Sequence, residues 1–150
     1  MLQHSTHLKP QKPTGAFVMA SWSSFFIGAV AYLVGVWNST LPLTEKGYYF
    51  TLLMYGLFSA ISLQKVVRDR LEGIVVTDIY YMLSWISMLL SILLLGVGLW
   101  NSSMLLSEKG FYIMAFVLSL FSSITIQKNI RDLALFPKDE FKTIDIEEEE

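Results

Sequence analysis

Few side chains in this sequence could carry out acid–base catalysis or bind a metal ion, and all of them lie outside its long apolar stretches. The two histidines, His4 and His7, are spaced so that both could contact one metal ion. They belong to the polar segment 1–14, where histidines are usually solvent-exposed, and we assign them no role. The absence of cysteine excludes disulfides, thiol catalysis and thiolate metal sites. We therefore expect no catalytic residue, no metal and no other cofactor.

Two glutamate–lysine pairs are the remaining candidates for proton transfer. Each pair precedes a glycine, and the two tripeptides are Glu45-Lys46-Gly47 and Glu108-Lys109-Gly110. A carboxylate beside an amine could serve as an acid–base pair. Ion pairs in exposed loops are, however, common and weak, so we interpret these residues as structural or as contacts to lipid headgroups.

Both pairs belong to a unit that occurs twice without a gap. Trp37-Asn38 recurs as Trp100-Asn101, and positions 37 and 100 differ by 63. Roughly half of the positions in 35–69 are identical at this offset, which indicates a tandem duplication. A Gln-Lys-x-x-Arg-Asp motif recurs at the same offset, as Gln64, Lys65, Arg68 and Asp69 and as Gln127, Lys128, Arg131 and Asp132.

The distribution of charge predicts a membrane protein. Hydrophobic residues make up 53% of the chain, the mean hydropathy is +0.50, and four runs contain neither charged residues nor histidine: 17–37, 47–64, 79–100 and 110–127. At about 1.5 Å per helical residue each run spans roughly 27–33 Å, close to the hydrocarbon core of about 30 Å. We predict an all-α membrane protein whose four transmembrane helices form two parallel tandem hairpins, within repeats 15–72 and 78–135.

Basic residues predict the orientation of these helices. One side of the predicted membrane has only Lys46 and Lys109, whereas the other has Lys9, Lys12, Lys65, Arg68, Arg70, Lys128 and Arg131. Because positive charge is enriched on the cytoplasmic side, we expect both termini to be cytoplasmic. We expect residues 1–14 to be a flexible lead and the acidic residues 136–150 to be a disordered tail. The first apolar run is too long for the core of a cleaved signal peptide, so we expect it to remain as an anchor.

Small residues recur at helical spacing in the first and third runs. The first stripe is Ser21, Ser24, Gly28, Ala31 and Gly35, and the second is Ser84, Ser87, Ser91 and Gly98. Small residues allow helices to approach closely in lipid, so we interpret both stripes as packing faces, with a polar pathway as the alternative. We also expect Asn38 and Asn101 to end their helices in the left-handed conformation, and Thr44 and Ser107 to cap the next helices.

The repeated motifs resemble the YiaA/YiaB family of small bacterial inner-membrane proteins. The likeness rests on two copies of Trp-Asn, Ser/Thr-Glu-Lys-Gly-Tyr/Phe-Tyr, Leu-Phe-Ser and Gln-Lys-x-x-Arg-Asp, and it extends over about 14–132. It implies a two-helix unit present twice and a location in the bacterial inner membrane. It implies no activity and no ligand.

Three hypotheses for function follow. The first is a non-enzymatic membrane protein that packs against copies of itself or another membrane protein. Its expected partners include the lipid bilayer but no nucleic acid. The second is a small oligomeric transporter or passive channel, although a proton-coupled carrier generally needs an ionisable group within the membrane and the four runs contain none. The third is that the Gln-Lys-x-x-Arg-Asp motifs bind anionic lipid, with about 1 kcal/mol per basic residue, rather than only setting orientation.

Overall fold

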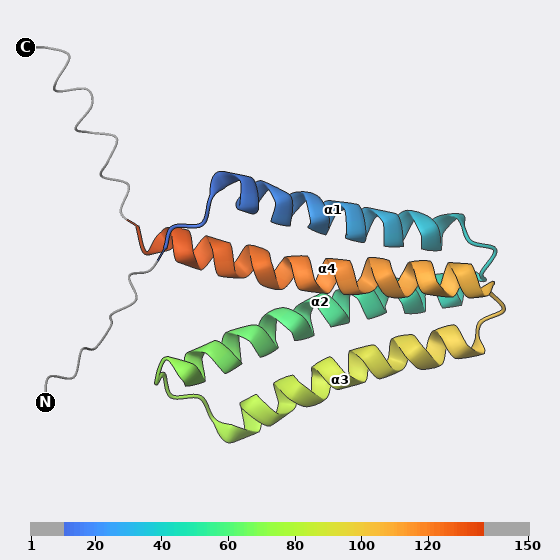
Figure 1. The fold of residues 1–150 in the computed structure, drawn as a ribbon. Helices are drawn as coiled ribbons and strands as arrows, with labels where there is room; N and C mark the ends of the chain where they lie inside the picture. The colour runs from blue at the N-terminus through green and yellow to red at the C-terminus, as the bar shows by residue number, and fades with distance from the viewer. Residues whose placement is uncertain (1–10, 137–150) are drawn as a thin grey trace, which may run out of the picture.

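A computed structural model describes residues 11–136 and shows a bundle of long helices (Figure 1). The described helices are α1 (Gly15–Asn38), α2 (Leu43–Leu71), α3 (Asp78–Asn101) and α4 (Leu106–Ala134). All four are long and apolar enough to cross a membrane, which confirms the predicted all-α membrane fold. The predictions for His4, His7 and the acidic tail from residue 137 lie outside the described residues.

The second and fourth helices are longer than their apolar runs. α2 and α4 each contain 29 residues, about 43 Å at 1.5 Å per residue, and α1 and α3 contain 24. The extra turns continue past 47–64 and 110–127 at both ends and include the Glu-Lys-Gly and Gln-Lys-x-x-Arg-Asp motifs. The charged motifs are therefore helical extensions of the spans.

The ends of α1 and α3 differ from the prediction. Asn38 and Asn101 are the last helical residues, and every described non-glycine residue has a negative φ, so the expected left-handed caps are wrong. The following serines end the helices instead. The hydroxyl of Ser39 donates to the carbonyl of Val36 at 2.7 Å, and Ser102 repeats this contact with Leu99 at 2.8 Å. A serine hydroxyl thus satisfies a carbonyl that a left-handed residue would otherwise have satisfied.

The predicted N-caps of the returning helices are also wrong. α2 begins directly after Pro42 and α4 directly after Leu105, so Thr44 and Ser107 lie inside the first turns. The carboxylate of Glu108 accepts a hydrogen bond of 2.8 Å from the backbone N–H of Leu105, which places an acidic group where the helix dipole favours it. The side chain of the third helical residue, rather than a hydroxyl before the helix, satisfies the free N–H.

The main helix contacts join the two repeats. α1 packs chiefly along α4, α2 packs chiefly along α3, and α2 also contacts α4, whereas α1 and α2 touch only over a short stretch (Figure 1). The 63-residue offset converts α1 into α3 and α2 into α4, so the α1·α4 and α2·α3 interfaces are equivalent. The two hairpins therefore form one cross-packed unit.

The bundle has two distinct ends. We call the end with the starts of α1 and α3 and the ends of α2 and α4 the terminal end, and the end with the connections 39–42 and 102–105 the loop end (Figure 1). Aromatic residues fill the core towards the loop end. The ring centroids of Tyr49 and Tyr112, which are equivalent in the two repeats, lie 6.1 Å apart with an interplanar angle of 19°.

The predicted small-residue packing is confirmed most clearly at Gly28. A Cβ atom at this position would lie 2.8 Å from Ser119 Oγ and 3.0 Å from Ser119 N, so the backbones of α1 and α4 nearly touch. Such close approach is the usual role of small residues between membrane helices.

Candidate functional site

The two Gln-Lys-x-x-Arg-Asp motifs come together at the terminal end. They lie on the last turns of α2 and α4, which are neighbours in the bundle. Arg131 joins the two helices, because its Nη1 lies 3.7 Å from Oδ1 of Asp69 and it also contacts Glu72. We refer to Gln64, Lys65, Arg68, Asp69, Gln127, Lys128, Arg131 and Asp132 as the motif cluster.

The lysine and aspartate of each motif form an ion pair along their own helix. Lys65 Nζ is 2.7 Å from Asp69 Oδ2, and Lys128 Nζ is 2.8 Å from Asp132 Oδ2. Both lysine side chains are largely exposed, so each pair adds little to stability. The recurrence of aspartate in both copies therefore has a local structural explanation.

The arginines of the two motifs are not in equivalent environments. Arg131 reaches across to α2, whereas Arg68 Nε lies 3.5 Å from Oε1 of Glu72 on its own helix. The position equivalent to Glu72 is Leu135, so α4 offers no matching acceptor. The cluster is therefore built from repeated residues but is asymmetric.

Two polar atoms of the cluster are buried without a hydrogen-bond partner among the described residues. They are Gln64 Oε1 and Gln127 Oε1, while the buried Arg68 Nε has only its 3.5 Å ion pair with Glu72. Gln64 and Arg68 also line a crevice of about 390 Å³ between α2 and α4, together with Glu72, Lys128 and Arg131. Buried polar groups normally find partners, so these atoms mark the place where a polar ligand group would fit.

One buried polar residue near the cluster escaped the sequence analysis. Asn129 is only 2% exposed, and its Nδ2 donates to Ser21 Oγ of α1 at 3.1 Å. The equivalent residue in the first repeat is Val66, which is buried too. The sequence does contain a signal for this contact, because a polar residue, Asn129, stands 63 positions after an apolar one, Val66.

The other repeated motif lies at the loop end and does not join the motif cluster. Trp37 and Trp100 are strongly exposed there, as expected for side chains at a membrane surface, and Asn38 and Asn101 beside them are exposed too. Glu45, Lys46, Gly47, Glu108, Lys109 and Gly110 occupy the first turns of α2 and α4.

The loop motif closes its own turns. Lys46 Nζ donates to the carbonyl of Trp37 at 2.8 Å, which ties the start of α2 to the end of α1. Glu108 holds the start of α4 through its contact with the backbone N–H of Leu105. A Cβ atom at Gly47 or Gly110 would meet nothing within 4 Å, so neither glycine is required by packing. These contacts support the structural interpretation of the motif.

The serine stripes do not form a polar path in the described bundle. The hydroxyls of the stripe residues Ser21, Ser84 and Ser91 donate to carbonyls of their own helices at 2.8–2.9 Å, and Ser119 of α4 does the same at 2.7 Å. Among residues 11–136 there is no group of three or more acidic or histidine side chains placed to hold a metal ion. The motif cluster, by contrast, holds charged side chains that could form hydrogen bonds with a charged headgroup, and none of its described side chains is an activated nucleophile.

Comparisons with known proteins agree with the architecture. The model of a family described as the yiaA/B two-helix domain matches residues 17–69 and 80–132. The chain is 54% identical to the inner membrane protein YiaA of Escherichia coli (strain K12) over 125 residues, which cover 83% of this chain and 86% of that protein. It is 29% identical to the inner membrane protein YiaB of the same organism over 105 residues, covering 68% of this chain and 87% of that protein.

A shorter relative matches about one repeat. The uncharacterized membrane protein YubF of Bacillus subtilis (strain 168) is 36% identical over 63 residues, which cover 41% of this chain and 72% of that protein. No solved structure matches this chain. None of these relatives has an enzymatic name, so the comparisons assign a family and a membrane setting.

Proposed function

This chain belongs to the yiaA/B two-helix domain family, and on that premise we propose that it is a non-enzymatic, multi-pass protein of the bacterial inner membrane that packs against a second copy of itself. The observation that supports this most is the position of α1 and α3 on the outside of the bundle. Each has one main neighbour, α4 and α2 respectively. Each therefore presents a long apolar face on which another helix could pack.

The exposed faces of the two outer helices are equivalent in the repeats. Val30 of α1 and Leu93 of α3 occupy the same place at the 63-residue offset, and both are exposed. A contact of α1 with α1 of a second copy, or of α3 with α3, would be self-complementary and two-fold symmetric, as is usual for homodimers.

We propose the same orientation that the basic residues predict, with both termini in the cytoplasm. The motif cluster, Arg70 and the connection around Val75 would then lie on the cytoplasmic side. A thiol introduced by Val75→Cys should be protected from a membrane-impermeant reagent in intact cells, whereas Thr40→Cys at the loop end should be labelled. The reverse pattern would overturn this orientation.

A transporter or channel has less support. The serine hydroxyls that could line a passage donate to their own helices, and Tyr32, Leu53 and Phe116 fill the centre of the bundle. An assembly of several copies could still enclose a pore, and flux across reconstituted vesicles would detect it.

Disulfide cross-linking tests self-association directly, because the natural chain contains no cysteine. Val30→Cys and Leu93→Cys should each give an oxidised dimer in native membranes if the outer helices meet a second copy. Phe58→Cys, which is also exposed but lies on the central helix α2, serves as the matched control and should remain monomeric. Absence of dimer from both outer positions, together with a monomeric mass in lipid, would refute the proposal.

A further inference from the structure

Three neighbouring cavities lie between the motif cluster and the middle of α3 and α4. The polar crevice between α2 and α4 shares Gln64 and Arg68 with an adjoining apolar cavity of about 390 Å³, whose other walls include Val67 and Trp85. That cavity in turn shares Met88 and Ile124 with a groove between α3 and α4. The shared lining residues therefore place the three cavities next to one another, from the charged motif cluster to the middle of α3 and α4.

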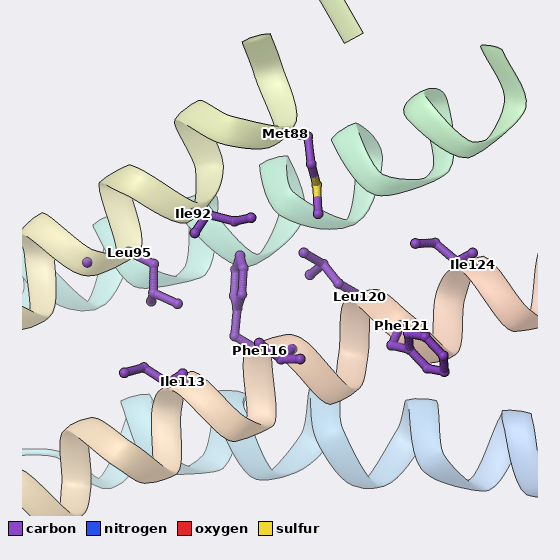
Figure 2. A pocket seen from close by; sticks show the side chains of 10 residues that line it. Met88, Ile92, Leu95, Ile113, Phe116, Leu120, Phe121 and Ile124 are labelled. Atoms are coloured by element: carbon purple, nitrogen blue, oxygen red, sulfur yellow. The ribbon is translucent and has the colours of Figure 1, made fainter. Parts of the chain in front are cut away.

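The groove furthest from the motif cluster is almost entirely apolar. It has a volume of about 350 Å³ and lies between Met88, Ile92 and Leu95 of α3 and residues of α4 (Figure 2). Figure 2 shows Phe116 and Leu120 of α4 directed towards these α3 side chains across the gap. A flexible hydrocarbon chain fits such a groove, because it needs no polar partner there.

Two polar residues lie where the polar and apolar parts meet. Gln64 and Arg68 line both cavities. The buried Gln64 Oε1 has no hydrogen-bond partner among the described residues, and Arg68 Nε has only its 3.5 Å ion pair with Glu72. Arg68 Nε offers a donor and Gln64 Oε1 an acceptor. A bound group should therefore combine a negatively charged oxygen with a hydrogen-bond donor, at the boundary between water and hydrocarbon.

The net charge of the polar crevice between α2 and α4 selects among lipid headgroups. Its lining has three basic residues, Arg68, Lys128 and Arg131, and two acidic ones, Glu72 and Asp132, which leaves one net positive charge. A phosphodiester with one negative charge neutralises this excess, and hydroxyls on the headgroup could donate to Gln64. A zwitterionic headgroup leaves the excess charge uncompensated.

From these observations we propose that the crevice is a binding site for one anionic glycerophospholipid with a hydroxyl-bearing headgroup, such as phosphatidylglycerol. The phosphate lies at Arg68, the headgroup hydroxyls reach Gln64, and one acyl chain follows the cavity past Met88 into the groove between α3 and α4. The site is distinct from the outer faces of α1 and α3, so its test does not depend on self-association.

Native mass spectrometry of the full chain with defined lipids tests the site. The natural protein should retain one phosphatidylglycerol per chain in preference to phosphatidylethanolamine. Arg68→Gln should lower its retention at least about tenfold, because a charge-assisted hydrogen bond and the excess positive charge are both lost. Arg70→Gln removes the same charge from an exposed residue that lies outside the motif cluster and does not line the crevice, and it should leave retention unchanged.

Two further measurements separate a lipid site from a phosphate site and from general attraction to charge. Met88→Trp, which fills the junction of the two apolar cavities, should weaken phosphatidylglycerol retention while the melting temperature stays close to that of the natural protein. Glycerol 3-phosphate, which has no acyl chain, should not compete. Equal losses in Arg70→Gln and Arg68→Gln, equal retention of both lipids, or competition by glycerol 3-phosphate would each overturn the proposal.

Discussion

At the α1·α4 interface two backbones nearly touch at a glycine of α1, whereas at the equivalent positions of α2 and α3 the glycine lies on α2 and faces α4. Gly28 of α1 lies against Ser119 of α4. The 63-residue offset places Ser91 on α3 and Gly56 on α2, so glycine and serine have exchanged sides. Gly56 also provides room for Phe116 of α4, whose Cζ would lie 2.5 Å from a Cβ atom there. The central α2·α4 contact thus explains why glycine belongs on α2.

The two interfaces also differ in where a side chain ties them together. In α2·α3 the hydroxyl of Tyr48 donates to the carbonyl of Leu94 at 2.5 Å, near the loop end. Its counterpart in α4 is Phe111, which has no hydroxyl. In α1·α4 the tie is Asn129 to Ser21, at the terminal end. Equivalent interfaces can therefore be stabilised at opposite ends once a duplicated unit has diverged.

Among substitutions at these two interfaces, Gly28→Ala should lower the free energy of unfolding the most. The added Cβ atom would lie 3.1 Å from the carbonyl of Ala115 as well as 3.0 Å from Ser119 N, and backbone atoms cannot rotate away. We expect the free energy of unfolding to fall by about 1–3 kcal/mol, the usual cost of overpacking. Circular dichroism during unfolding in mixed micelles would measure it.

A glycine with free space around it supplies the control. A Cβ atom at Gly96 of α3 would meet nothing within 4 Å, so Gly96→Ala should leave stability unchanged or raise it by up to about 1 kcal/mol through helix propensity. If Gly28→Ala were no more destabilising than Gly96→Ala, close backbone contact would not be what holds α1 to α4.

This contrast shows how much of the fold follows from the sequence. Runs free of charge predicted the four spans, and the small residues predicted close packing, because hydropathy and side-chain size are properties of each segment alone. The choice of partner was not predictable in the same way. Small stripes on α1 and α3 fit either neighbour. The partners depend on contacts between helices, such as that of Gly28 with Ser119, which joins α1 to α4, and that of Gly98 with Tyr48, which joins α3 to α2.

The candidate site was predictable in its residues but not in its geometry. The repeated Gln-Lys-x-x-Arg-Asp motif identified every member of the motif cluster. Its sequence gave no sign that Arg131 would cross to Asp69, or that Gln64 and Arg68 would border a crevice, because both depend on the distance between α2 and α4. The caps predicted at Asn38 and Thr44 were wrong for local reasons. The hydroxyl of Ser39 satisfies a carbonyl at the end of α1, and α2 begins directly after Pro42.

Tyr48→Phe should produce an intermediate effect that is confined to α2·α3. It removes the hydroxyl that donates to Leu94 while the ring remains against Gly98, so the free energy of unfolding should fall by about 1 kcal/mol. Tyr80→Phe, an exposed tyrosine on α3, is the matched control and should have little effect. Equal stabilities for the two variants would show that the tie at the loop end contributes nothing.

Asn129→Val should have the smallest effect, because it makes α1·α4 resemble the equivalent interface with Val66. The hydrogen bond to Ser21 is lost, and hydrogen bonds between membrane helices average only about 0.6 kcal/mol. Ser21 keeps its own bond to the carbonyl of Phe17, and the unpartnered Oδ1 of Asn129 disappears, which offsets part of the loss.

The reciprocal change tests whether the position of this tie matters. Val66→Asn would place an amide opposite Ser84, the equivalent of Ser21, and should likewise change the free energy of unfolding by less than about 1 kcal/mol. A loss above about 2 kcal/mol in Asn129→Val alone would mean that Asn129 has a role beyond Ser21. Its buried Oδ1, which has no hydrogen-bond partner among the described residues, would then be the atom to investigate.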